Sequence, residues 1–212
     1  MDYNAQDKQI HIVNLAVCAS LQAFEEYSSR SLNCRRDVIA AIRVKLRPYL
    51  QEIAEREYAE TCMGNVRDKI IKLVLALDKT PGVEDLLSEV VTGDHGMTLH
   101  EQAPYGVVLA IYPATNPCAT MINNVISMLA AGNSVISIPN PRCMETSQFL
   151  TEKINEAIEE ACGIQNLVVT LPESRNDLLT EIINHPDVAL VVATGGRKMM
   201  SHVLCSPKRV IA

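Results

Sequence analysis

The sequence predicts an α/β protein in which N-terminal helices and a β-hairpin precede a doubly wound parallel sheet of about five strands. Three observations predict it. Residues 106–112 form an unbroken apolar run of strand length, which is typical of a parallel strand buried on both faces. From residue 104 onward, strand-like and helix-like segments alternate along the chain. Residues 1 to about 80 instead carry the apolar spacing of amphipathic helices.

The first third of the chain is predicted to be helical. In a first helix, one face is expected to hold Ile12, Leu15, Ala16, Ala19, Leu21 and Phe24. Three further helices are predicted over residues 35–50, 50–62 and 68–77. The apolar residues of the first of these three are Val38, Ile39, Ile42, Val44, Leu46 and Leu50. Pro48 is expected to kink or end that helix, because proline lacks the N–H group that a helix interior requires.

Residues 88–104 differ from the segments on either side of them. Short β-prone runs flank Gly93-Asp94-His95-Gly96, which is rich in turn-forming residues. We therefore interpret this segment as a β-hairpin. It divides the chain into a helical segment over 1–87, the hairpin over 88–104 and a sheet domain over 105–212.

The sheet domain is predicted from the alternation after residue 104. Its strands are expected over 106–112, 134–138, 167–171, 188–192 and 209–212, and its helices over 116–132, 144–162, 174–184 and 196–205. Strands and helices that alternate at this spacing favour a parallel sheet of Rossmann type with right-handed crossovers. Such sheets bind ligands at the carboxyl ends of their strands, so the residues that follow the strands are the first candidates for a site.

Composition argues against several classes of partner. The net charge of −6, the aromatic fraction of 4% and the absence of Trp provide no basic or aromatic surface for nucleic acid. No apolar run approaches transmembrane length, and the acidic N-terminus is no signal peptide, so a cytoplasmic protein without a membrane partner is expected. The seven cysteines lack CxxC spacing and the five histidines lack metal-ligand spacing. Free thiols and no metal site are therefore expected.

Asn116 is the first candidate site residue, because it follows the strand over 106–112. Its side-chain NH₂ can donate a hydrogen bond to a developing oxyanion without titrating. The alternative is structural, since Asn before Pro117 at a helix start is a common capping arrangement.

Two further loops also follow predicted strands. Thr194-Gly195-Gly196 opens a helix, where free N–H groups and the helix dipole favour a phosphate, although a tight turn without ligand is the alternative. Pro139-Asn140-Pro141 ends the second strand, where the adenosine half of a dinucleotide normally lies. Its alternative is a stiff loop that contacts no ligand.

Several longer stretches also resemble one enzyme family. They are PYGVVLAIYPATNP over 104–117, INNVISMLAAGNSV over 122–135, Thr61-Cys62-Met63-Gly64 with Asp68-Lys69-Ile70, Thr80-Pro81-Gly82, and Ala193-Thr194-Gly195-Gly196. In this order they resemble the CoA-acylating aldehyde dehydrogenases, which include members from bacterial microcompartments. The resemblance extends over nearly the whole chain.

The resemblance implies a reaction and roles for the candidate residues. Full-length relatives would convert a small aldehyde, CoA and NAD (or NADP) to acyl-CoA and the reduced cofactor. Asn116 matches the residue that stabilises the thiohemiacetal oxyanion, and the hairpin matches an oligomerisation element, so a homo-oligomer is expected. The residues that the resemblance assigns to cofactor binding are Pro113, Ala114, Thr115, Pro139, Asn140, Pro141, Thr194, Gly195 and Gly196.

The chain departs from the family pattern at two points. Asn140 stands where the acylating branch tends to have His, which leaves the choice between NAD and NADP open. The nucleophilic Cys of the family lies beyond the strand that matches 209–211, and the sequence stops at Ala212. Cys118 lies near a helix start, where the pKa of a thiol could fall, but it matches no nucleophile of the family and has no general base near it in sequence, so no catalytic role is expected for it. The other six cysteines are interpreted as core or surface residues.

We therefore interpret the chain as the N-terminal, cofactor-binding portion of such an enzyme, without its catalytic thiol domain and inactive alone. The alternative is a non-catalytic nucleotide-binding or interaction module derived from the same family. The expected location is the cytoplasm, or the interior of a bacterial microcompartment.

Overall fold

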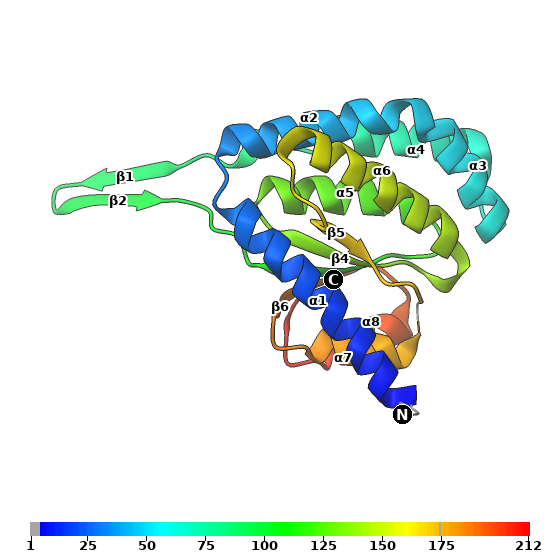
Figure 1. The fold of residues 1–212 in the computed structure, drawn as a ribbon. Helices are drawn as coiled ribbons and strands as arrows, with labels where there is room; N and C mark the ends of the chain where they lie inside the picture. Colours follow the sequence, from blue (N-terminus) through cyan, green and yellow to red (C-terminus); the bar gives the residue numbers. More distant parts are fainter. Residues whose placement is uncertain (1–4, 174) are drawn as a thin grey trace.

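A five-stranded parallel sheet lies between two layers of helices in the computed structural model, which describes residues 5–173 and 175–212 (Figure 1). The strands of this sheet are β3 (Val107–Ile111), β4 (Ser134–Ile138), β5 (Val168–Thr170), β6 (Val188–Ala193) and β7 (Arg209–Ile211). They lie in the order β5-β4-β3-β6-β7, and all neighbours are parallel. The predicted doubly wound sheet is confirmed, and β3, the first of its strands along the chain, lies at its centre.

The crossover helices alternate with these strands as the sequence predicts. They are α5 (Pro117–Ala130), α6 (Met144–Cys162), α7 (Asn176–Asn184) and α8 (Arg197–Leu204), with a short 3₁₀ helix η3 (Pro141–Cys143) before α6. The predicted start of the third helix at residue 174 lies outside the described residues. Gly163 ends α6 in the left-handed region, with φ of 75°, a conformation that glycine adopts without the strain of a Cβ.

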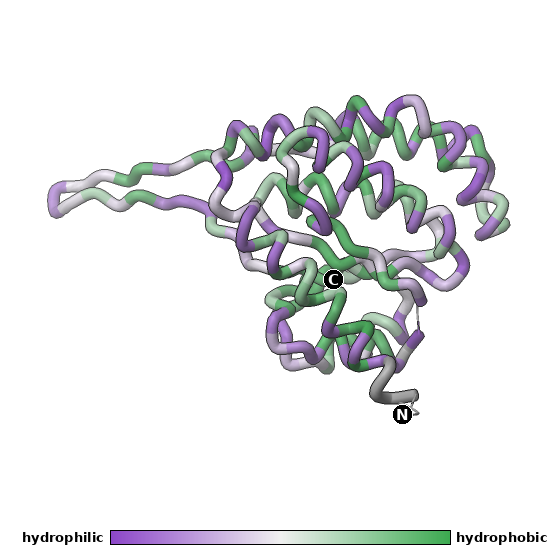
Figure 2. The backbone as a smooth tube through the Cα atoms, viewed as in Figure 1, coloured by the Kyte–Doolittle hydropathy of each residue, from purple (hydrophilic) through white to green (hydrophobic). Residues whose placement is uncertain are grey.

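Strand β3 separates the two hydrophobic cores because its side chains alternate between the faces of the sheet. Val108, Ala110 and Tyr112 belong to the core under α5 and α6. Val107, Leu109 and Ile111 belong to the core under α1 (Ala5–Ser28), α7 and α8. All of β3 is buried, which explains its unbroken apolar sequence. Figure 2 shows this hydrophobic centre, and the helices around it alternate between hydrophobic and hydrophilic residues.

The N-terminal helices lie on both faces of the sheet. The helices α2 (Leu32–Leu46), α3 (Leu50–Thr61) and α4 (Val66–Lys79) share the core of α5 and α6, whereas α1 contacts β4, β5 and α7. Pro48 lies in the 3₁₀ helix η1 (Arg47–Tyr49) between α2 and α3, so the predicted interruption is confirmed. The division into segments 1–87, 88–104 and 105–212 stays a proposal.

The predicted apolar face of the first helix is correct only in part. Of its six residues Ala16 is buried, four are half-buried and Leu15 is exposed. The residues that α1 buries are Val13, Ala16, Val17, Ser20, Ala23 and Tyr27. Leu15 is 58% exposed, and Val44, counted among the apolar residues of the second helix, is 75% exposed. The buried residues of α1 follow three- and four-residue steps through Ser20, a polar residue whose hydroxyl donates to Ser134 Oγ at 2.9 Å. A hydropathy pattern cannot find such a position, because its burial depends on a partner in the sheet.

The hairpin projects from the body of the molecule (Figure 1). It follows the 3₁₀ helix η2 (Val83–Asp85) and consists of β1 (Glu89–Gly93) and β2 (Gly96–His100), joined by Asp94 and His95. Every residue of both strands is exposed. The prediction of a hairpin is confirmed.

None of the helices in the described residues is long and apolar enough to cross a membrane.

Candidate active site

One cavity at the carboxyl edge of the sheet brings together every site residue that the sequence predicts. It has a volume of about 570 Å³ and lies where β3, β4 and β6 end. The predicted residues that line it are Pro113, Ala114, Thr115, Asn116, Pro139, Asn140, Pro141, Thr194, Gly195 and Gly196. Parallel neighbours carry their carboxyl ends to the same edge, so loops that are far apart in sequence meet there.

Asn116 stands at the N-cap position of α5, but its side chain does not cap the helix. Lys72 Nζ of α4 instead donates a hydrogen bond to Asn116 Oδ1 at 2.7 Å. The backbone oxygen of Asn116 accepts bonds from Thr120 N and Thr120 Oγ1, at 3.1 and 2.7 Å. The Asn116 side chain therefore does not act as a helix cap, which was the structural alternative. Its NH₂ group remains available to donate a hydrogen bond to a ligand.

The loop after β6 is the exposed wall of the cavity. Thr194, Gly195 and Gly196 are all exposed, and Thr194 N donates to Ile111 O at 3.0 Å. Gly196 is the N-cap of α8 and offers no side chain to the first N–H groups of that helix. A Cβ placed on Gly196 would meet no atom within 4 Å, whereas one on Gly195 would lie 3.3 Å from Met199. A ligand can therefore approach the helix end at Gly196.

The loop after β4 is fixed by hydrogen bonds within the loop itself. Asn140 Oδ1 accepts a hydrogen bond from Arg142 N at 3.1 Å, and Asn140 O accepts one from Cys143 N at 2.9 Å. The amide oxygen of Asn140 thus starts the short helix η3. Contact between this loop and a cofactor stays a prediction.

Tyr112, which lines the cavity, belongs to a buried polar pair that the sequence did not reveal. The Tyr112 hydroxyl lies 3.1 Å from Ser137 Oγ, and both residues are buried. Burial raises the pKa of Tyr112 well above its ordinary value, although the bond to Ser137 partly opposes that shift. Tyr112 is therefore neutral, and it fixes the end of β3 to β4.

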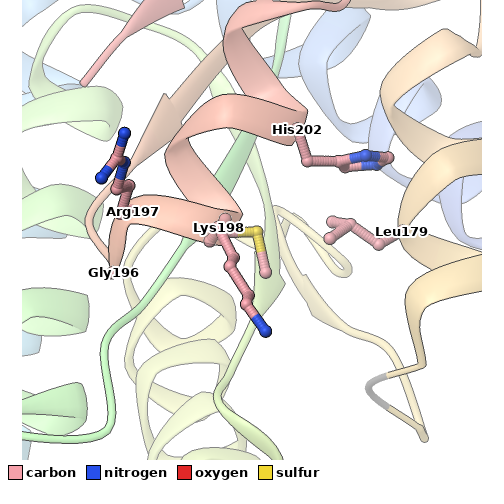
Figure 3. A pocket seen from close by; sticks show the side chains of 6 residues that line it. Leu179, Gly196, Arg197, Lys198 and His202 are labelled. Carbon is pink, nitrogen blue, oxygen red and sulfur yellow. The ribbon is translucent and has the colours of Figure 1, made fainter.

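A second hollow between α7 and α8 adjoins the first. It has a volume of about 720 Å³, and its lining residues are Leu179, Gly196, Arg197, Lys198, Met199 and His202 (Figure 3). It shares Gly196 and Met199 with the first cavity. In Figure 3, Leu179 of α7 faces the α8 side chains, and Arg197 extends away from it. The sequence analysis missed this hollow; the two adjacent cations after Gly196 were its only signal.

A shallow groove opens on the opposite side of Asn116, between α4 and α5. Its polar and charged lining residues are Lys72, Lys79, Thr80, Asn116, Thr120, Asn123, Asn124 and Thr194. Asn116, Thr120 and Thr194 also line the first cavity. Asn116 therefore stands between the cavity and the groove, at a place where a ligand on either side can reach it.

The family model of the aldehyde dehydrogenases matches residues 3–211, which is nearly the whole chain. The chain belongs to the aldehyde dehydrogenase family. Its relatives include the CoA-propanoylating propanal dehydrogenase of Salmonella typhimurium, which is 44% identical over 199 residues. That match covers 94% of this chain and 43% of the relative, so the chain spans less than half of the relative's length.

Three solved structures match the fold with a TM-score of 0.91, each over 94% of this chain and 46% of the other. One is propionaldehyde dehydrogenase from Rhodopseudomonas palustris with bound CoA and an acylated cysteine, at 38% identity. Another is an engineered glycolyl-CoA reductase with bound NADP⁺, at 38% identity. The third is propionaldehyde dehydrogenase from the fucose utilisation bacterial microcompartment of Clostridium phytofermentans, at 40% identity.

Among the described residues of this aldehyde dehydrogenase chain, no cysteine lines the cavity. Cys118 is fully buried, although it lies two residues after Asn116. A hydrogen bond with Cys143, burial and the nearby carboxylate of Glu57 raise the pKa of Cys118 well above its ordinary value. The Cys118 thiol is therefore protonated and belongs to the core. Within the described residues, no group of three or more His, Cys, Asp or Glu side chains could hold a metal ion.

Proposed function

We propose that the chain is the cofactor-binding portion of an NAD(P)-dependent, CoA-acylating aldehyde dehydrogenase. Its reaction is aldehyde + CoA + NAD(P)⁺ → acyl-CoA + NAD(P)H + H⁺. One observation supports this most strongly: loops from three strands place a fixed amide donor and an open helix N-terminus in the same cavity. The cofactor supplies the hydride acceptor, and residues of this chain orient it.

The two adjoining hollows fit the two halves of a dinucleotide. The pyrophosphate is placed at Gly196, where the first N–H groups of α8 are free of a side-chain cap. The adenosine is placed between α7 and α8, where Leu179 and Met199 provide apolar contact. The nicotinamide then lies in the first cavity, near Asn116. Asn116 serves as the donor that stabilises the oxyanion formed when a thiolate adds to the aldehyde.

Titration with NADH, followed by its fluorescence, tests this proposal. Wild-type chain is expected to bind NADH weakly, and Gly196→Val should reduce the affinity by at least about tenfold because the valine side chain occupies the approach to α8. Gly93→Val is the matched control, since a Cβ at this hairpin position also meets no atom within 4 Å. Equal binding by wild type and Gly196→Val would contradict the placement of the cofactor.

The 212-residue chain by itself is expected to form no NADH from propionaldehyde and CoA. The reason is that Cys118, the thiol nearest to Asn116 in sequence, is buried and protonated. Turnover that disappears in Cys118→Ser would contradict this expectation. Absence of turnover together with NADH binding fits both a portion of an enzyme and the alternative of a non-catalytic nucleotide-binding module.

The hairpin supports a further part of the proposal, namely assembly into a homo-oligomer. Val90 pairs with Leu99 and Thr92 with Met97, so these four side chains share one face of the ribbon. Leu99 is 56% exposed, and Val90 and Met97 are exposed beside it. Unpaired strand edges and an apolar face favour association with a second copy. By similarity to the microcompartment relative, we also propose that the enzyme works in a bacterial microcompartment.

Light scattering coupled to size exclusion tests the assembly. Leu99→Lys places a charge on the apolar face and should shift the chain from an oligomer toward a monomer. Thr98→Lys is the control, because Thr98 pairs with Val91 on the opposite face of the ribbon. A wild-type chain that stays monomeric on tenfold concentration would contradict the proposal.

A further inference from the structure

Asn116 combines a capping position with a side chain that does not cap. Its backbone dihedral angles are φ −146° and ψ 57°, and α5 begins at the next residue. Asparagine at this position normally accepts a hydrogen bond from one of the first N–H groups of the helix. In α5 those donors belong to Cys118 and Ala119, and neither is bonded to Asn116 Oδ1 in the described part of the chain. The side-chain oxygen of Asn116 is instead bonded to another group.

That group is the ammonium of Lys72, which lies 44 residues away in sequence. An ammonium carries only donors, so the amide atom that faces it must be the oxygen. The contact therefore fixes which way the amide lies, and it leaves the NH₂ group as the free end. Asn116 lines the cavity at the carboxyl edge, so this end is available to a ligand there.

Contacts on both sides of Lys72 fix the position of α4 along α5 and α3. Three residues before Lys72, the ammonium of Lys69 forms an ion pair with Glu57, and both side chains are almost completely buried. Eight residues after Lys72, Thr80 Oγ1 accepts a hydrogen bond from Asn123 Nδ2 at 3.0 Å. Lys72 therefore projects from a segment that is anchored to α3 and α5, which favours a defined contact over an adventitious surface one.

The surroundings of Lys72 also favour the contact with Asn116. The described residues that line the groove around Lys72 include no Asp or Glu, and the second cation of the groove is Lys79. Among the described residues, Lys72 forms no ion pair, and the amide oxygen of Asn116 is its hydrogen-bond acceptor. The ammonium therefore adds positive charge beside the site, which further favours an oxyanion at the NH₂ end.

We propose that Lys72 is a positioning residue that withholds the Asn116 side chain from the cap of α5 and directs its NH₂ group to the cavity. This inference deepens the proposed function, because it rests on the assignment of Asn116 as the oxyanion donor. It predicts that the orientation of the Asn116 NH₂ group depends on a lysine of another helix. The sequence close to Asn116 does not contain that lysine.

Side-chain and backbone NMR of the 15N-labelled chain tests the inference. The Asn116 NH₂ signals are assigned by their loss in Asn116→Ser. In Lys72→Met, Asn116 is expected to turn and cap α5, so its NH₂ signals shift and hydrogen exchange at Ala119 N or Cys118 N slows by about tenfold. Lys72→Arg, which keeps a cationic donor, should restore the wild-type signals.

Lys79→Met is the matched control. It removes the same charge from the same groove, and Asn116 should not respond to it. Unchanged Asn116 and Ala119 signals in Lys72→Met, or an equal change in Lys79→Met, would overturn the inference. The remaining backbone signals report whether each variant folds. Failure of wild-type chain to bind NADH would count against the proposed function but would not alter the NMR signals, which are measured without cofactor, so the two failures are distinguishable.

Discussion

On one side of the site cavity, the loop after β3 is held by side chains of α4, β4 and α5, whereas the loop after β6 on the other side is exposed along its length. In the loop after β3, which we call the fixed loop, Lys72 forms a hydrogen bond with Asn116 and Ser137 forms one with Tyr112. In the loop after β6, which we call the open loop, a backbone hydrogen bond from Thr194 N to Ile111 O connects the chain to the sheet.

In the proposed function, the two loops have two different tasks. A donor aimed at a developing charge must be held in place before the reaction, so it benefits from a buried frame. A loop that admits and releases a cofactor must leave the N–H groups of the helix accessible. The three predictions below test the fixed side first, where the expected effects are largest, and then the open side.

The largest effect is expected from breaking the buried pair of Glu57 and Lys69, which anchors α4 on the fixed side. Glu57→Gln leaves the Lys69 ammonium buried without its counter-ion, and should lower the free energy of unfolding by about 3–5 kcal/mol. Urea unfolding measures this loss of stability. The double variant Glu57→Gln/Lys69→Met should recover most of that loss.

The control for this prediction is the exposed pair of Glu52 and Arg56 on α3. Glu52→Gln should cost about 0.5 kcal/mol or less, because water screens this pair. A loss in Glu57→Gln no larger than that in Glu52→Gln would show that the buried pair does not anchor the fixed side.

A smaller effect is expected from alkaline pH, acting on Tyr112. Burial raises its pKa in the folded chain above the ordinary value of about 10, so its contribution to stability is complete below that pH and is lost as pH rises further. Each pH unit above about 10 should cost about 1.4 kcal/mol for this residue. Tyr112→Phe should therefore make unfolding less sensitive to alkaline pH than in the wild type.

A second buried tyrosine calibrates that measurement. Tyr27 is also buried, and burial raises its pKa in the same direction, partly opposed by Arg35. Tyr27→Phe should act like Tyr112→Phe. Identical alkaline unfolding curves for wild type and Tyr112→Phe would contradict the buried state of Tyr112.

The smallest effect is expected on the open side, from Arg197 and Lys198 in the first turn of α8. If these cations contact a ribose phosphate, replacing both with Ala should weaken NADPH binding about threefold more than NADH binding, because exposed charges contribute little. Fluorescence titration at low salt measures it. Lys79→Ala is the control for charge alone, and an equal loss for both cofactors would exclude a phosphate contact.

Local sequence signals predicted most of the fold because each of them is decided within a few residues. Pro48 interrupts a helix wherever it occurs, and the fully apolar run at β3 suits a central strand. The face of α1 was predicted only in part, for the opposite reason. Its burial follows from contacts with β4 and α7, so Ser20 is buried while Leu15 is exposed.

The sequence by itself determined that Asn116, Asn140 and Gly196 would meet, because parallel strands carry their carboxyl ends to one edge whatever the details of packing. Only the tertiary structure decided that Lys72 holds Asn116, that Cys118 is buried beside Cys143, and that a hollow lies between α7 and α8. These contacts depend on how far one helix is shifted along another, and that shift is set by side-chain packing over the whole core.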